Sequence, residues 1–142
     1  MGHYMAIIVK DKMVEASVAR SLVGERLVNH DVADYYDADD STYVVSGDKP
    51  VATLEEFLET YEDNFGRFTP VAFFVVRCED DYSYVDEEIF PSEFYEFYEQ
   101  KNEREELLKL YKEVFHNQVV KNVKNLLEEN SDLEVISMDY HF

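Results

Sequence analysis

Val71-Ala-Phe-Phe-Val-Val76 is the stretch of sequence that decides the fold. It is a continuous apolar run of strand length, bounded by Pro70 and by the polar segment Arg77-Cys-Glu-Asp-Asp81. A run without polar alternation is typical of a strand that is buried on both faces. We therefore predict a central strand here, and a neighbouring strand over Tyr82-Ser-Tyr-Val85 that the acidic turn joins to it.

The sequence before this run predicts alternating strands and helices. The expected elements are a strand over Tyr4 to Val9, an amphipathic helix over residues 13–29, a loop or frayed helix end over residues 31–40, and a strand over Thr42 to Val45. In the helix, Val14, Val18 and Leu22 stand at helical spacing and are followed by Val28. Thr53-Leu-Glu-Glu56 then matches a capping box, in which the Thr hydroxyl accepts the Glu56 amide and the Glu56 carboxylate reaches back. We expect a helix to begin at this box.

The sequence after the apolar run predicts two helices and a closing strand. Pro91-Ser92 opens the first helix, a longer one covers residues 103–129, and the strand covers Leu133 to Met138. The long helix carries a stripe with a period close to 3.6 residues: Leu107, Leu108, Tyr111, Val114, Phe115, Val119, Val123, Leu126 and Leu127. If this stripe is wider than one core can cover, the helix has a partner.

These elements predict one α+β domain over residues 1–142. A chain with 46% apolar and 15% aromatic residues can bury a core, despite its high charge. We expect a four- to five-stranded mixed or antiparallel sheet that is covered by helices on at least one face.

The charge balance excludes several classes of partner. The chain has 32 Asp and Glu against 13 Lys and Arg, a net charge of −19. A protein that binds DNA, RNA or an anionic membrane surface directly needs a positively charged surface. We also see no apolar stretch that could span a bilayer and no signal peptide, and the single cysteine suits a reducing compartment. We therefore expect a cytoplasmic protein.

The negative charge is concentrated in the middle of the chain. Residues 31–99 contain twenty acidic and three basic residues, a net charge of −17, whereas both flanks are close to balanced. Acidic residues can serve solubility alone, but this concentration favours a function for the charge.

No motif for catalysis or for a cofactor is present. There is no nucleotide-binding glycine loop, nucleophile elbow or two-histidine helical spacing. Residues 37–48 overlay partly on a calcium-binding EF-hand loop, but Thr42 stands where glycine is needed and Asp48 where the bidentate Glu belongs. We predict neither an enzyme nor a bound cofactor or metal.

We expect an acidic inhibitor that blocks the cationic nucleic-acid-binding groove of a nuclease or defence effector. In size and charge the chain resembles anti-restriction, anti-CRISPR and nuclease-immunity proteins, and no motif ties it to any of these families. The candidate partner-binding residues are Asp31, Asp34, Asp37, Asp39, Asp40, Glu79, Asp80, Asp81, Asp86, Glu87, Glu88, Glu93 and Glu96. The alternative is a homo-oligomeric assembly module, such as a homodimer built on the long helix, whose acidity serves only solubility.

Overall fold

The computed structural model describes residues 3–30, 33, 35–36, 53, 55–56, 59, 70–89 and 105–141. The strands are β1 (His3–Asp11), β2 (Tyr35–Tyr36), β3 (Pro70–Glu79), β4 (Tyr82–Ile89) and β5 (Leu133–His141). The helices are α1 (Ala16–Asn29) and α4 (Glu105–Glu129). The strands form one sheet in the order β2-β5-β1-β3-β4. The predicted α+β fold is confirmed, with the long helix followed by the last strand.

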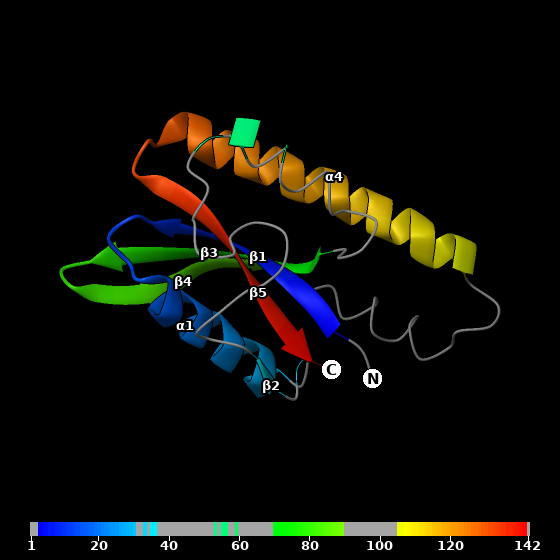
Figure 1. Ribbon diagram of the computed structural model, residues 1–142, viewed down its shortest axis with the longest axis horizontal. Coiled ribbons are helices and arrows are strands. Elements are labelled where there is room, and N and C mark those ends of the chain that lie inside the picture. Colours follow the sequence, from blue (N-terminus) through cyan, green and yellow to red (C-terminus); the bar gives the residue numbers. More distant parts are fainter. Residues whose placement is uncertain are drawn as a thin grey trace.

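The sheet is mixed, because one of its four strand pairs is parallel. β1 runs parallel to β3, while β1–β5, β2–β5 and β3–β4 are antiparallel. Parallel strands end at the same edge of a sheet, so the carboxyl ends of β1 and β3 lie side by side. At the opposite edge His3 pairs with His141, which brings the two ends of the chain together (Figure 1).

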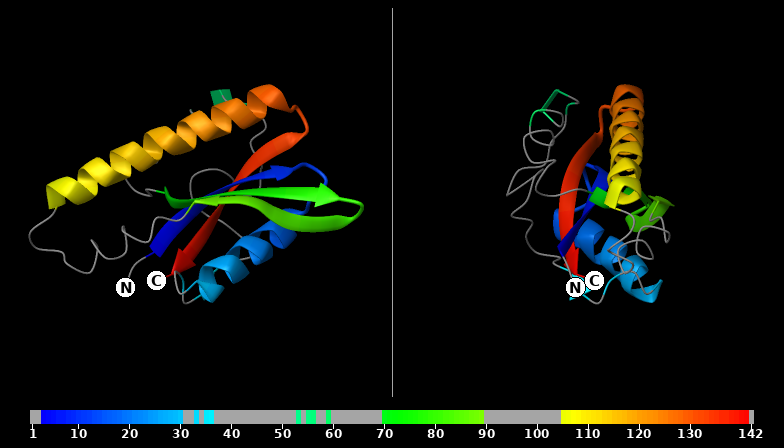
Figure 2. Two further views of the ribbon diagram at one scale, coloured as in Figure 1. Left: turned by 180° about the vertical axis from the view of Figure 1, so that it is seen from behind. Right: turned by 90° about the vertical axis from the view of Figure 1, so that its right-hand side faces the viewer.

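The two helices cover opposite faces of the sheet (Figures 1 and 2). Alternate strand residues point to opposite faces, and they separate here into two buried clusters. One cluster joins α1 to Ile8, Phe74 and Ile136. The other joins α4 to Ile7 and Phe73. The sheet is therefore the middle layer of three.

β3 has the burial that its sequence predicts. The five residues from Ala72 to Val76 are fully buried, and their side chains divide between the two clusters. β4 pairs with β3 through the acidic turn and extends beyond the predicted Val85 to Ile89. The predicted hairpin is confirmed, but β3 continues through Arg77, Cys78 and Glu79, which we predicted to follow the strand.

α1 is shorter than predicted and buries a different face. It begins at Ala16, and its buried residues are Ala19, Arg20, Val23, Gly24 and Leu27. Of the predicted face, Val14 is buried just before the helix, Leu22 and Val28 are half-buried against the same cluster, and Val18 is exposed. The prediction was wrong because the small residues of the other face let the helix approach the sheet and Tyr36 closely.

Gly24 shows how close this approach is. A Cβ at this position would overlap the ring of Tyr36 in β2. The Tyr36 hydroxyl donates to Glu25 Oε1 at 3.0 Å, and burial together with this hydrogen bond raises the pKa of Tyr36. β2 lies inside the segment that we predicted as loop, so that part of the prediction was wrong.

Lys10 is buried at the end of β1, beyond the predicted strand. It is 2% exposed, and Nζ donates to Val14 O and to Glu134 Oε1, each at 2.5 Å. Its charge therefore has a paired carboxylate, as a buried ammonium requires. The bond to Val14 O also fixes the connection between β1 and α1.

Several predicted elements lie outside the described residues. They are the strand over 42–45, most of the helix after the capping box, the helix from Pro91, and the EF-hand-like residues 37–48. One part of the capping box is described: the Glu56 amide donates to Thr53 Oγ1 at 3.2 Å, as predicted. Neither α1 nor α4 is both long and apolar enough to cross a bilayer.

Candidate interaction surface

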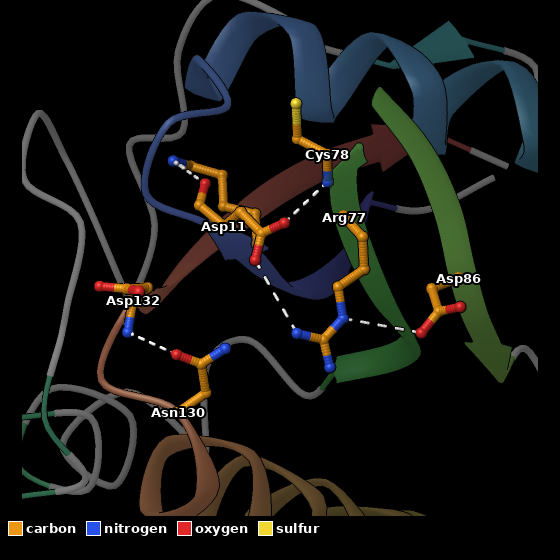
Figure 3. Close-up of polar contacts among 7 residues, drawn as sticks. Asp11, Arg77, Cys78, Asp86, Asn130 and Asp132 are labelled. Carbon is orange, nitrogen blue, oxygen red and sulfur yellow. Dashed lines mark hydrogen bonds and ion pairs between the residues drawn. The ribbon is translucent and has the colours of Figure 1, made fainter. Parts of the chain in front are cut away.

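Three chain connections meet at the carboxyl ends of β1 and β3 (Figure 3). The carboxylate of Asp11, at the end of β1, accepts the amide of Cys78 in β3 at 2.7 Å. The next residue, Lys12, donates its amide to the carbonyl of Asp132 at 2.8 Å. The β1–α1, β3–β4 and α4–β5 connections are thereby held beside one another.

The side chain of Asn130 orders the α4–β5 connection. Asn130 Oδ1 accepts the amide of Asp132 at 2.8 Å, and the Asn130 amide continues the helix by donating to Leu126 O. This is an Asx turn, which positions the carbonyl of Asp132 for Lys12. The helix end and the strand start are therefore fixed relative to β1.

The β3–β4 connection is a two-residue turn. Its central residues, Asp80 and Asp81, have φ values of 50° and 65°. Positive φ at both positions is what a type I′ hairpin turn requires, and Asn-Gly is its favoured sequence. The turn projects beyond the ends of α1 and α4 (Figures 1 and 2).

Exposed carboxylates gather around the three connections. We call this part of the molecule the acidic end and define it by seven exposed residues: Glu15, Glu79, Asp80, Asp81, Glu128, Glu129 and Asp132. The exposed cation within the three connections is Lys12. A surface with this balance attracts cationic partners over about a Debye length, roughly 8 Å at physiological salt.

Three exposed apolar side chains lie at the acidic end: Met13, Val18 and Tyr82. Among the described residues, Met13, Val18, Tyr82 and Val114 are the large hydrophobic residues that remain exposed. Met13 lies in the β1–α1 connection, Val18 in the first turn of α1, and Tyr82 directly after the hairpin turn. Met13 is 75% and Tyr82 70% exposed, so both can contact another molecule.

Arg77 forms ion pairs with two carboxylates beside the sheet. Its guanidinium lies 3.8 Å from Asp11 Oδ1 and 3.6 Å from Asp86 Oδ2 (Figure 3). Asp86 is the extra residue of a β-bulge in β4, because Val75 pairs with Glu87 and Val76 with Val85. The bulge therefore turns Asp86 toward Arg77 and away from the regular ladder.

Glu88 also has a partner within the protein. Arg26 of α1 donates Nε to Glu88 Oε2 at 2.8 Å and forms a second bond to Oε1. These hydrogen bonds lower the pKa of Glu88 and raise the pKa of Arg26. The pair joins α1 to β4, so part of the charge of Glu88 serves the fold.

The structure thus separates the candidate residues into groups. Glu79, Asp80 and Asp81 lie together at the hairpin turn, Asp86 and Glu88 form ion pairs, and Glu87 is exposed on β4. The other candidates lie outside the described residues: Asp31, Asp34, Asp37, Asp39, Asp40, Glu93 and Glu96.

Sequence reasoning did not place Met13, Glu15 or Asp132 at the same end of the molecule as the hairpin turn. They come from segments that are far apart in the chain, and only the strand pairing brings these segments together. The available signal is the parallel pairing of two apolar strands, whose carboxyl ends are a common place for binding sites. Within the described ranges, no three His, Cys, Asp or Glu side chains are grouped as a metal site would need.

Comparisons with protein-family models, with curated proteins and with solved structures found no significant match.

Proposed function

We propose that the protein is an acidic inhibitor that occupies the cationic nucleic-acid-binding groove of another protein. The observation that carries this proposal is the acidic end, where seven exposed carboxylates lie in or next to three connections and share this end of the molecule with exposed Met13 and Tyr82. A groove that has evolved to bind phosphates attracts such a surface by the same electrostatic forces. The exposed apolar side chains add contacts that depend little on salt.

The residues of the hairpin turn support a role for its charge. Asn-Gly would satisfy the positive φ angles at these two positions with less strain than Asp80 and Asp81 do. The chain instead has two carboxylates at this projecting turn, beside the exposed Glu79. Residues that fit their backbone conformation less well than the favoured ones are typical of a site under functional constraint.

A homo-oligomeric assembly module has less support. From Phe115 to Leu127 the apolar side chains of α4 are buried or half-buried in the cluster with the sheet. Val114 is the large apolar side chain that remains exposed among the residues of α4 whose side chains are described. In the part of α4 whose side chains are described, one exposed valine is a small surface compared with the roughly 800 Å² from each subunit that a stable dimer needs.

Affinity capture with matched charge variants tests the proposal. The tagged protein is incubated with a bacterial lysate at about 0.1 M salt, where steering by charge is still strong. We expect basic nucleic-acid-binding proteins to be retained, to elute as salt rises, and to be displaced by excess duplex DNA. Mass spectrometry identifies the retained proteins.

Glu79→Lys and Glu113→Lys provide the comparison. Both side chains are exposed and both substitutions change the net charge equally, but Glu113 lies on α4 away from the acidic end. We expect Glu79→Lys to reduce the capture and Glu113→Lys to preserve it. Equal capture by the two variants, or retained proteins that bind no nucleic acid, would contradict the proposal.

A further inference from the structure

Tyr82 and Tyr84 form an aromatic column on one face of the β3–β4 hairpin. Their ring centroids lie 6.2 Å apart with an interplanar angle of 15°, so the rings are stacked. Tyr84 is half-buried, whereas Tyr82 is 70% exposed and ends the column next to the turn. The outer part of this column can therefore contact a partner.

Tyr84, the half-buried ring of the column, already has a cation beside it within the protein. Tyr84 pairs across the strands with Arg77, so both side chains lie on the same face of the hairpin. The Arg77 guanidinium lies between the carboxylates of Asp11 and Asp86 (Figure 3). An arginine next to a tyrosine, with carboxylates on two sides, is therefore built into the fold.

Tyr82, the exposed ring of the column, has a carboxylate at the cross-strand position where Tyr84 has an arginine. Tyr82 pairs across the strands with Glu79, two residues from Arg77 and on the same face. The turn adds the exposed carboxylates of Asp80 and Asp81. Within the described part of the chain, no ion pair is formed by Glu79, Asp80 or Asp81.

We propose that Tyr82 and Glu79 receive an arginine side chain of a basic protein partner, whose guanidinium stacks on the Tyr82 ring and pairs with the Glu79 carboxylate. This inference rests on the proposed function, because that function supplies the basic partner. Arginine fits better than lysine, since its planar and weakly hydrated guanidinium can stack on a ring while its N–H groups bind a carboxylate. The turn carboxylates would add attraction for either cation.

Short cationic peptides test this inference without a known partner. The probes are tetra-arginine amide and tetra-lysine amide, which carry equal charge, at about 0.15 M salt. Amide chemical shifts of residues 79–84 report binding at the hairpin separately from binding to acidic residues elsewhere. We expect tetra-arginine to bind these residues about two- to fivefold more tightly than tetra-lysine, as one cation–π contact allows.

Two substitutions of Tyr82 isolate the aromatic contribution. Tyr82→Phe retains the ring and should keep the preference for arginine, whereas Tyr82→Leu retains apolar surface only and should remove it. If wild type shows no preference, or if Tyr82→Leu keeps it, the inference is overturned.

Glu79→Lys separates this inference from the proposed function. We expect it to weaken the binding of both peptides at the hairpin. If Glu79→Lys weakens both peptides while Tyr82→Leu leaves the arginine preference intact, only the role of Tyr82 fails. Peptide binding that Glu79→Lys leaves unchanged would overturn both proposals.

Discussion

At the scale of single residues, Gly24 controls how closely α1 approaches β2. In an exposed helix a Gly→Ala substitution increases stability by about 1 kcal/mol. Here the added methyl group would meet the ring of Tyr36. Overpacking costs about 1–3 kcal/mol. The methyl group would overlap the inner ring atoms Cγ, Cδ1 and Cδ2 of Tyr36, so the cost lies in the upper part of this range and exceeds the helical gain.

We therefore expect Gly24→Ala to lower the free energy of unfolding by about 1 kcal/mol or more. Urea denaturation followed by circular dichroism measures the change. The control is the same substitution in a Tyr36→Ala background, where the ring is absent and Gly24→Ala should be stabilising. A stabilising effect in the wild-type background would show that Tyr36 moves away at little cost.

Lys10 shows a limit of prediction from residue types. The sequence places a lysine after an apolar strand, where an exposed strand end is the usual interpretation. In the structure it is buried, because Glu134 of β5 and the carbonyl of Val14 surround its ammonium group. Glu134 is more than a hundred residues away in the chain, and no local pattern connects the two positions.

At the scale of elements, the β3–β4 hairpin combines a strained turn with a concentration of charge. The Asp80→Asn/Asp81→Gly double variant keeps the type I′ turn and removes two negative charges. We expect it to increase the free energy of unfolding by about 0.5–1 kcal/mol. Thermal or urea unfolding measures this change.

The same variant distinguishes function from stability. We expect it to bind a basic partner less well than wild type, although it folds more stably. A variant that is both more stable and equally good at binding would show that the turn carboxylates serve no partner.

The Arg26–Glu88 pair joins α1 to β4 and makes stability depend on pH. Because the pKa of Glu88 is lowered in the folded state, the pair stabilises the protein above the ordinary pKa of glutamate. The stabilisation is lost as the pH falls through the lowered value. The pair is partly exposed, so we expect it to contribute about 0.2–1 kcal/mol at neutral pH.

Arg26→Gln tests this contribution. The variant should be less stable than wild type at neutral pH, and the difference should shrink once the pH has fallen below the lowered pKa of Glu88. Urea denaturation at the two pH values provides the comparison, with Lys124→Gln as a control on the exposed surface of α4. A difference that stays constant with pH would exclude the proposed coupling.

Local patterns predict the elements better than their packing. The apolar run in β3, the β3–β4 hairpin and the long helix α4 are confirmed, because each depends on residues that are close in the chain. The face of α1 was predicted wrongly, because two sets of residues have helical spacing and the choice between them depends on β2 and the sheet. β2 itself has two residues, too few to give a pattern.

At the scale of the whole molecule, the net charge of −19 opposes compactness. Like charges repel one another more strongly in a folded chain than in an expanded one, and salt screens this repulsion. We expect the melting temperature to rise by about 2–5 °C when salt is increased from about 0.01 M to 0.3 M. Scanning calorimetry measures this shift. A melting temperature that falls with salt would mean that ion pairs such as Arg26–Glu88 outweigh the repulsion.

The candidate surface was only partly predictable. The three hairpin acids were identified from the sequence, because they are consecutive. Met13 and Asp132 were not, because their positions depend on how β1 pairs with β3 and with β5. Charge patterning therefore identifies acidic segments, and only the topology shows which of them share an end of the molecule.

The pairing of His3 with His141 has a practical consequence. Both ends of the chain leave the sheet at the edge farthest from the carboxyl ends of β1 and β3 (Figure 1). An affinity tag or a surface linker at either end therefore attaches to the side of the molecule opposite the acidic end. A protein immobilised in this way presents Tyr82 and its neighbouring carboxylates outward, in one orientation, to a partner in solution.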